Sequence, residues 1–428
     1  MAAASGPLPL ENWGADGAAD ALERRVLDLL RKGNLPQAEV LLRCRLDESG
    51  PEARALNILG WIAATVQMPA FAAGYFRQAS ELAPDWQLPQ DNLAHLEPLL
   101  RETVSRNGSS GRFLFIKAWG YGFWSDVAHV LGQLLLAELT GRTPIVQWGA
   151  DSLFWDGRCA NAFESYFEPV SPYSVRDVEQ QRPSIWPPKW NLGNLTAREV
   201  NKWNGPFARI AALYLLGRRE QLLVSDFFTS VRDLRPWIPA ESPLHGLSVD
   251  ALYGYLAQKY LDPQPQIRDA VERFHAAHLA AGDYVAVHAR GSDKAREVQG
   301  LEHIHAQYEG VIDTLRTTHG IRRIFLLTDD ARLREAFGRR YGMDLVCTDC
   351  LRTASLQGLH YQAIADRQRL GIEVMVDTYL ATRARGFVGN GCSSVSHMVR
   401  YLRDWPDECA LLLGPNLNHA PNLFLHDW

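Results

Sequence analysis

The sequence has few cysteines and no long apolar segment. Its 428 residues include six scattered cysteines, too few for a scaffold held together by disulfides. No apolar run approaches the ~18–20 residues that cross a bilayer. The N-terminus lacks the basic segment followed by an apolar segment that marks a secretory signal. We therefore expect a cytoplasmic protein with no membrane span.

An excess of positive charge is also absent. The chain has 44 basic and 49 acidic side chains, for a formal net charge of −5, which gives no electrostatic reason to expect nucleic acid as a partner. Hydrophobic residues make up 46% and charged residues 22% of the chain, as is ordinary for a globular protein. At ~150 residues per domain, the length predicts two or three domains.

Patterns that bind metal are sparse. Cys347 and Cys350 form a C-x-x-C pair, but no second pair or histidine cluster lies nearby in the sequence. Buried or incidental thiols are therefore favoured over a zinc site. No D-x-D follows an apolar strand, where it would hold a metal-bound nucleotide. We expect neither a metal nor another cofactor.

Residues 19–105 carry a helical repeat. Ala38 and Ala72 lie 34 residues apart, and so do Leu42 and Phe76. This interval is typical of tetratricopeptide helix pairs, in which small residues let two helices approach and large apolar residues fill the groove between repeats. The sequence therefore predicts an all-α tetratricopeptide-like region, with an ordinary helical subdomain as the alternative.

This helical region is short for an independent repeat array. Two units and a half-unit at residues 88–104 fall below the three repeats that usually make such an array stable. We expect the region to rest on the remainder of the protein or on a second chain. Residues 1–18 are predicted to be a flexible N-terminus, and the Gly-, Ser- and Asn-rich residues 106–112 to mark a domain boundary.

The pattern changes to alternating strands and helices after this boundary. Residues 113–119 predict a buried strand, apolar residues at helical spacing follow over 127–135, and residues 143–148 predict a second strand. Gly141 is placed to end the helix in a left-handed conformation. The resulting βαβ unit predicts a Rossmann-like domain with a parallel sheet over 106–245.

The C-terminal part repeats this pattern. Short apolar strands are predicted at 284–290, 323–330 and 386–390, each followed by polar or glycine residues and then by a helical stretch. Long loops are predicted over 149–204. The fold class is therefore α/β, with a second Rossmann-like domain over 246–428.

The end of the first of these C-terminal strands carries a candidate phosphate site. Strand alternation puts His288 and Arg290 on one face, at the carboxyl edge where open parallel sheets bind ligands. The planar fork of an arginine can donate two charge-assisted hydrogen bonds to a diphosphate. The alternative is an arginine that simply pairs with Asp293.

The next two strand ends add polar groups. Asp329 and Asp330 follow the second strand, where paired acids usually cap the next helix. Ser393 and Ser394 follow the third, just before a helix predicted from about Val395. The N–H groups and positive dipole end of a helix start attract anions, whereas simple N-capping by either serine is the alternative.

An ordered set of motifs resembles the α1,6-fucosyltransferases. The motifs are VHARGSDK (287–294), LLTDD (326–330), GLH (358–360), RLGIEVMVDTYLA (369–381) and FVGNGCSS (387–394). The stretch 120–148, together with FVGNGCSS, also resembles protein O-fucosyltransferases. The resemblance covers roughly residues 113–428. It implies two Rossmann-like domains in the GT-B arrangement and an inverting, metal-independent transfer of fucose from GDP-fucose.

The resemblance also implies roles for single residues in binding the donor. Arg290 and Ser394, with Ser393 beside it, match positions that hold the β-phosphate. His288 and Asp377 match positions that recognise guanine, although Asp377 lies beside the apolar stripe of its helix, a position that predicts exposure to solvent.

Further positions match residues close to the sugar. Asp329 and Asp330 match paired acids near the ribose and sugar, and Tyr308 a donor-contacting tyrosine. Lys294 and a nearby glutamate match a proposed base relay. Glu297 is one residue short of the family spacing, so Glu302 and Asp293 stay open as the base.

For other polar and aromatic residues the sequence predicts only whether they are exposed or buried. Lys117 and Arg142 are predicted to be solvated surface charges, with assistance to the leaving group as the alternative. Trp186, Trp190 and Trp203 are predicted to be core residues, with stacking on an acceptor sugar as the alternative.

Two further functions remain open at this point. One is transfer from another nucleotide sugar, and the other is a repeat-based adaptor whose Rossmann half is inactive. The expected partners are a nucleotide-sugar donor, a glycan, glycolipid or protein acceptor, and a second copy or another protein bound through the helical repeats.

Overall fold

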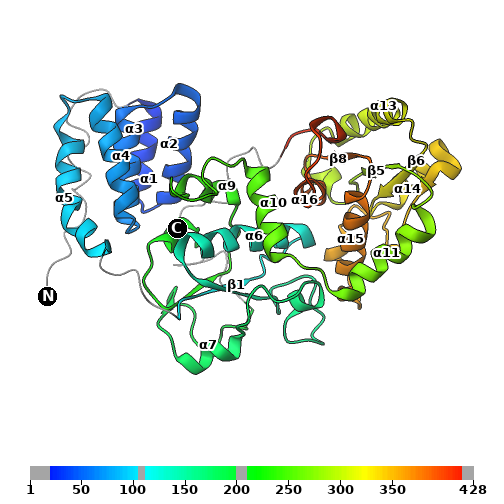
Figure 1. Cartoon of the computed structure of the whole chain (residues 1–428), viewed down its shortest axis with the longest axis horizontal. Coiled ribbons are helices and arrows are strands. Elements are labelled where there is room, and N and C mark those ends of the chain that lie inside the picture. The colour runs from blue at the N-terminus through cyan, green and yellow to red at the C-terminus, as the bar shows by residue number, and fades with distance from the viewer. Residues whose placement is uncertain (1–19, 105–110, 199–209, 417–428) are drawn as a thin grey trace.

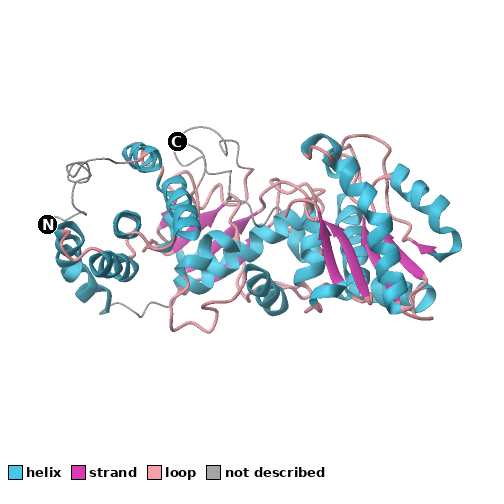
Figure 2. Ribbon diagram, turned by 90° about the horizontal axis from the view of Figure 1, so that it is seen from above, coloured by secondary structure: helices cyan, strands magenta, loops and turns pink. Residues whose placement is uncertain are grey.

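A computed structural model describes residues 20–104, 111–198 and 210–416. The N-terminal helices, a first sheet and a second sheet follow one another along the molecule (Figures 1 and 2). No helix in the described ranges is long and apolar enough to cross a membrane. The predicted flexible N-terminus, Trp203 and most of the predicted boundary at 106–112 lie outside these ranges, and the division into domains stays a prediction.

The N-terminal region consists of five helices: α1 (Ala21–Arg31), α2 (Leu35–Ser49), α3 (Ala53–Thr65), α4 (Pro69–Leu82) and α5 (Gln87–Val104). Ala38 and Ala72 are fully buried, and Leu42 and Phe76 are buried almost completely. A Cβ at Gly60 would lie 2.5 Å from the Phe76 ring, so only glycine allows α3 and α4 to lie this close. The burial of these residues agrees with the predicted helix contacts, whereas the tetratricopeptide assignment stays a prediction.

The first sheet is parallel, in the order β2-β1-β4-β3. Its strands are β1 (Phe113–Lys117), β2 (Thr143–Gln147), β3 (Ile185–Trp186) and β4 (Leu222–Ser225). Helix α6 (Phe123–Thr140) connects β1 to β2 and ends at Gly141, whose φ of 60° is left-handed, as predicted. The prediction of loops over 149–204 was wrong in part, because this stretch also forms β3, η2 (Ala162–Ser165) and α7 (Val175–Gln181).

Helices connect the last strand of the first sheet to the second sheet. They are α9 (Val231–Leu234), η3 (Arg235–Trp237), α10 (Val249–Tyr260) and α11 (Pro265–His278), whereas α8 (Leu213–Leu216) lies between β3 and β4. The break between α10 and α11 falls at the Asp- and Pro-containing residues 262–265, because proline cannot continue a helix from the preceding turn.

The second sheet is parallel throughout, in the order β7-β6-β5-β8-β9. Its strands are β5 (Tyr284–His288), β6 (Arg323–Leu327), β7 (Leu345–Val346), β8 (Gly386–Asn390) and β9 (Ala410–Leu413). The helices between them are α12 (Lys294–Glu297), α13 (Leu301–His319), α14 (Ala331–Tyr341), α15 (Arg367–Thr382) and α16 (Ser394–Tyr401), with η4 (Gly342–Asp344), η5 (Leu359–Tyr361) and η6 (Asp407–Cys409). The chain builds this sheet outward from β5 in both directions, so the strand order reverses between β5 and β8.

Buried contacts join the two sheets and their helices. We call the described residues of 111–260 the first unit and those of 265–416 the second unit. Helix α16 of the second unit lies against α6 and α10 of the first. The Trp124 Nε1 group on α6 donates a hydrogen bond of 2.8 Å to Thr378 Oγ1 on α15. Tyr253 and Tyr401 stack with ring centroids 4.5 Å apart. These contacts hold the carboxyl ends of the two sheets toward each other.

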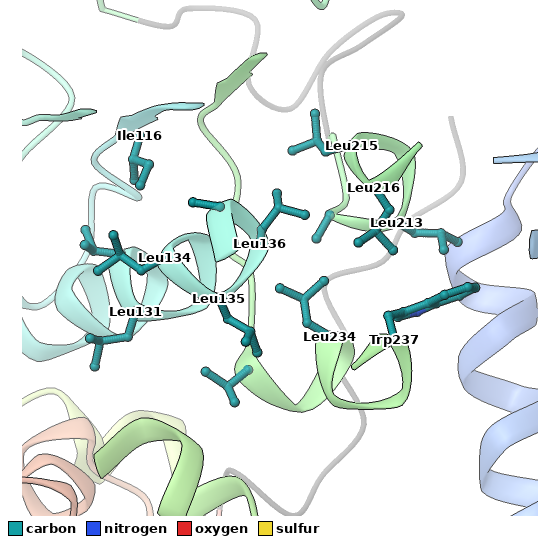
Figure 3. Packing of buried hydrophobic residues seen from close by; sticks show 14 of the residues in the cluster. Ile116, Leu131, Leu134, Leu135, Leu136, Leu213, Leu215, Leu216, Leu234 and Trp237 are labelled. Atoms are coloured by element: carbon teal, nitrogen blue, oxygen red, sulfur yellow. The ribbon is translucent and has the colours of Figure 1, made fainter. Parts of the chain in front are cut away.

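The helical region rests on the first α/β unit. Figure 3 shows Leu213, Leu234 and Trp237 between α6 and the blue N-terminal helices. Trp237 is 1% exposed, and its Nε1 group donates a 2.9 Å hydrogen bond to Glu39 Oε1 on α2. Burial raises the pKa of Glu39, and the paired Arg43 acts against this rise. The sequence predicts that the helical region rests either on the remainder of the protein or on a second chain. This contact is with the remainder of the protein.

We expect Trp237→Ala to lower the stability of the whole protein. Loss of a buried tryptophan costs about 3–5 kcal/mol, and the change also leaves Glu39 without this donor. Trp237→Phe keeps one aromatic ring but removes the N–H group and part of the indole volume, so it should cost less than Trp237→Ala. Urea denaturation followed by circular dichroism measures both variants. Equal stability of the alanine variant and the unchanged protein would show that the contact does not support the helical region.

Candidate active site

A cavity of about 650 Å³ lies between the carboxyl ends of the two sheets. Its second-unit wall includes Arg290 after β5, Asp329 after β6 and Ser394 after β8. Its first-unit wall includes Trp119 after β1 and Phe228 after β4. Open parallel sheets bind ligands where the strand order reverses, and this cavity lies outside that point of the second sheet. We call it the cleft.

Arg290 is buried in the cleft wall between two carboxylates. Its Nη2 atom lies 2.6 Å from Asp293 Oδ1, and its Nη1 atom donates to Asp329 Oδ2. Burial alone would lower the pKa of Arg290, but Asp329 and Asp293 outweigh it and raise the pKa. The structure thus contains the ion pair with Asp293, whereas the binding of a phosphate by Arg290 stays a prediction. The same pairing holds the guanidinium at the cleft surface, where the side chain is 14% exposed.

The two adjacent acids after β6 have different environments. Asp329 lines the cleft, whereas Asp330 is 2% exposed and caps α14 by accepting a 2.8 Å hydrogen bond from the Arg332 backbone N–H. Asp330 also accepts from the Ser292 backbone N–H at 3.2 Å. A Cβ at Gly291 would lie 2.4 Å from Asp330 Oδ2, so this close approach of two loops requires glycine. Asp330 therefore caps the next helix, which is the alternative that the sequence predicts, and it is not among the cleft residues.

The start of α16 presents donors to the cleft. Ser393 and Ser394 both line it, and their hydroxyls make no hydrogen bond within the described residues. The preceding turn is fixed by Asn390 Oδ1, which accepts a 2.8 Å hydrogen bond from the Cys392 backbone N–H. Capping of α16 by the Ser393 side chain is absent from this part of the structure. Both hydroxyls and the first-turn N–H groups can therefore donate to an anion.

His288 and Tyr308 lie behind the cleft wall. His288 Nδ1 is 2.7 Å from Ser396 Oγ, and Tyr308 donates a 2.7 Å hydrogen bond to the backbone carbonyl of His288. Burial, followed by the charge of Arg290, lowers the pKa of His288 to about 3, so its ring is neutral. In this structure the two side chains support β5 from behind and are not among the residues that line the cleft.

The expectation that Asp377 is solvated was wrong. Asp377 is 5% exposed, and Thr348 Oγ1 donates to its carboxylate at 2.6 Å. Burial raises the pKa of Asp377 to about 7. Leu370 and Val374 on the same helix line the cleft, whereas Asp377 lies one turn farther along and is covered by residues 348–352.

Lys294 and Glu297 form an ion pair at the cleft wall. The Glu297 side chain is 49% exposed, so it is accessible from the cleft. Glu302 is not among the cleft residues, and its carboxylate lies near His303. Of the three carboxylates considered as the base, the structure therefore places Glu297 and Asp293 at the cleft.

Several cleft residues were not assigned a role from the sequence. His360 belongs to the GLH motif, and burial, followed by the charge of Arg290, lowers its pKa to about 4. Tyr361 follows it, and Tyr121 and Phe228 face it from the first unit. The sequence does indicate the residues of the first unit, because aromatic side chains directly follow β1 and β4, and the strand ends of both sheets meet at the cleft.

Lys117 and Arg142 are buried, which corrects the prediction of surface charges. Lys117 Nζ lies 3.1 Å from Asp151 Oδ2 and donates to the Leu195 carbonyl at 2.7 Å. Arg142 donates to the carbonyls of Glu220 and Arg218, each at 2.8 Å. Both cations tie loops to the first sheet, and neither is among the cleft residues.

The tryptophans and cysteines singled out in the sequence lie elsewhere. Trp186 and Trp190 are 7% and 5% exposed, in agreement with the prediction of core residues. Cys347 and Cys350 are free thiols, and burial raises the pKa of Cys350 to about 12. Within the described ranges no group of three or more His, Cys, Asp or Glu side chains is arranged to hold a metal ion.

Comparison with known proteins gives only structural similarities. No family model matches the sequence, and no curated protein matches it. Fucosyltransferase NodZ from Bradyrhizobium is 17% identical over 69% of this chain and 93% of its own, with a TM-score of 0.43. POFUT1 in complex with GDP is 15% identical over 71% of this chain and 98% of its own, with a TM-score of 0.42. These similarities are weak, so the function proposed below is based on the cleft and on the sequence motifs.

Burial changes what we expect from Arg290→Ala. The sequence alone predicts a stable but inactive variant. Removing one partner of a buried ion pair typically costs about 3–5 kcal/mol, and here it would leave Asp293 and Asp329 facing each other. We therefore expect a clear loss of stability as well as of ligand binding, measured by urea denaturation. Arg339→Ala, which removes an exposed arginine paired with Glu335, should cost under about 0.5 kcal/mol. An Arg290→Ala variant as stable as this control would contradict the ion-pair arrangement.

Asp377 should make stability depend on pH. Its folded-state pKa of about 7 is raised from 3.8, so the folded protein binds this proton more tightly than the unfolded chain. The resulting stabilisation is complete below about pH 4 and is lost as the pH rises through about 7, by at most ~1.4 kcal/mol per pH unit. Asp377→Asn should flatten this part of the stability profile, whereas Asp85→Asn, at an exposed position, should not. Parallel profiles for all three proteins would show that the carboxyl does not titrate as described.

Proposed function

We propose that this protein is an inverting, metal-independent glycosyltransferase of the GT-B arrangement that transfers fucose from GDP-fucose to an acceptor hydroxyl. The observation that carries the proposal is the meeting of Arg290, Ser394 and the start of α16 in one cleft. A guanidinium, a free hydroxyl and helix N–H groups are together suited to a diphosphate.

The departure of GDP requires positive charge and hydrogen-bond donors. As the bond between the anomeric carbon and the phosphate oxygen breaks, negative charge grows on that oxygen. Arg290, Ser394 and the first-turn N–H groups of α16 are placed to stabilise this charge before the reaction starts, which is the most effective form of electrostatic catalysis. They would take the part that a divalent cation has in other transferases.

The acceptor hydroxyl needs a base on the opposite side of the sugar. A bond forms from the acceptor oxygen to the anomeric carbon while the bond to GDP breaks, and the acceptor proton passes to a carboxylate. Both candidates are ion-paired, but Glu297 is the more accessible, because its side chain is 49% exposed and that of Asp293 is 13% exposed. Such proton transfer contributes about 10²–10⁴ in rate. Lys294 positions Glu297 through their ion pair.

The identity of the nucleotide and of the sugar rests on the sequence motifs. The match of His288 and Asp377 to guanine-contacting positions supports GDP, but neither residue is part of the cleft lining. A contact between guanine and Asp377 therefore requires residues 348–352 to move aside. Transfer from another nucleotide sugar stays an alternative, because Arg290 and Ser394 would bind any diphosphate.

Calorimetric titration with GDP in EDTA tests the proposal. We expect GDP to bind the full chain in EDTA, because the cleft groups supply the countercharge themselves. Ser394→Ala should weaken GDP by ~10–100-fold, since a hydrogen bond to a charged group is worth about 1.5–3 kcal/mol. Ser355→Ala, at an exposed position outside the cleft, is the control.

Two outcomes would contradict the proposal. Absence of GDP binding with or without Mg²⁺ would remove both the GDP-fucose function and the cleft as its site, and would favour the inactive adaptor. Binding only when Mn²⁺ or Mg²⁺ is restored would overturn the metal-independent departure of GDP.

A further inference from the structure

The two walls of the cleft differ in chemistry. The second-unit wall carries the charged groups described above, whereas the loops after β1 and β4 place aromatic side chains on the opposite wall. Tyr121 in the first of these loops stacks on Trp119, with centroids 4.7 Å apart and planes 30° apart. Trp119 in turn contacts Phe227 edge-on at 4.9 Å. Tyr121 is thus half-buried, and its ring packs against Trp119, which Phe227 holds in turn.

A second tyrosine reaches the cleft from the other unit. Tyr361 ends η5, its side chain is 43% exposed, and its ring centroid lies 4.2 Å from that of His360. Both Tyr121 and Tyr361 are cleft residues. Each sheet unit therefore supplies one tyrosine, and a buried or half-buried ring lies behind each of them.

The two phenol groups line the same cleft as the candidate base Glu297, and that of Tyr361 lies near it. Burial in the first place, and then Tyr121, Glu297 and Asp293, raise the pKa of Tyr361 to about 12. Burial and then Asp126 raise the pKa of Tyr121. Both phenols are therefore neutral at neutral pH, so they can donate hydrogen bonds but cannot act as the base.

We propose that Tyr121 and Tyr361 form the acceptor subsite and that they bind one neutral pyranose ring of the acceptor next to Glu297. This proposal rests on the proposed function, because it takes Glu297 as the group that receives the acceptor proton. The structure thereby assigns acceptor binding to these tyrosines and not to Trp186 and Trp190, which are buried in the first unit.

The chemistry of the subsite favours a sugar ring over a charged or bulky acceptor group. A pyranose presents a flat C–H face, which suits an aromatic ring, and hydroxyls at its edge, which suit the phenols and carboxylates. The nearby cations already have partners, since Lys294 pairs with Glu297 and Arg290 with Asp293. A cavity of about 650 Å³ has the size of a small-molecule site, so a folded domain cannot enter it.

Saturation-transfer NMR on the full-length, GDP-saturated protein tests the subsite. The probes are methyl glycosides of glucose, galactose, mannose and N-acetylglucosamine in both anomeric forms. We expect at least one to bind, with saturation strongest for the protons of one ring face. Tyr361→Ala and Tyr121→Ala should each weaken that probe by ~3–10-fold, the range of an aromatic contact. Tyr361→Phe, which keeps the ring, should bind it more tightly than Tyr361→Ala.

Controls separate this proposal from the proposed function. Tyr173→Ala removes a tyrosine that is 44% exposed outside the cleft, and it should bind the probe as the unchanged protein does. GDP affinity is measured for every variant and should stay within ~2-fold, since none of the substituted tyrosines is assigned to the nucleotide. If GDP binds and no methyl pyranoside does, or if both alanine variants bind the probe unchanged, the subsite is overturned while the proposed function stands. If GDP does not bind, the proposed function fails, and this proposal fails with it.

Discussion

A guanidinium buried at the end of β5 determines how the loops around the cleft are arranged. Because a buried cation must be paired, Arg290 holds Asp293 on its own loop and Asp329 on the loop after β6. Ser292 has a φ of 43°, which is rare for a residue with a side chain, and its Oγ lies 2.7 Å from Asp329 Oδ2. The ion pairs thus hold a strained turn in place, and the cleft wall is formed before any ligand arrives.

The opposite wall of the cleft depends on the helical region. Ser230, Arg232 and Asp233 line the cleft at the start of α9, and this helix leads directly into the turn that ends at Trp237. Trp237 is fixed by Glu39 of α2. The N-terminal helices therefore support the first-unit wall, although they contribute no side chain to the cleft lining in the described structure. This arrangement explains how a short helical array can be stable in a single chain.

The sequence was informative wherever the cause of the structure is local. Apolar runs predict the buried parallel strands, Gly141 predicts the end of α6, and strand alternation places Arg290 at the sheet edge. The predictions were wrong where a residue is buried by contacts with residues far away in the chain. Lys117 is buried because its carbonyl acceptors lie about 80 residues away, and Asp377 is buried because residues 348–352 cover it. Strand β3 has two residues, too few for any periodicity to show.

The charges of the cleft side chains determine which group can attract an anion. On the second-unit wall, Arg290 and Lys294 face three carboxylates, those of Asp293, Glu297 and Asp329, and His360 is neutral near pH 7 because its pKa is about 4. The three carboxylates therefore offset the positive charge of the two cations. The N-terminus of α16, with its dipole and the hydroxyl of Ser394, must therefore supply the net attraction. In the proposed function, Arg290 then orients the diphosphate through hydrogen bonds and adds little net positive charge.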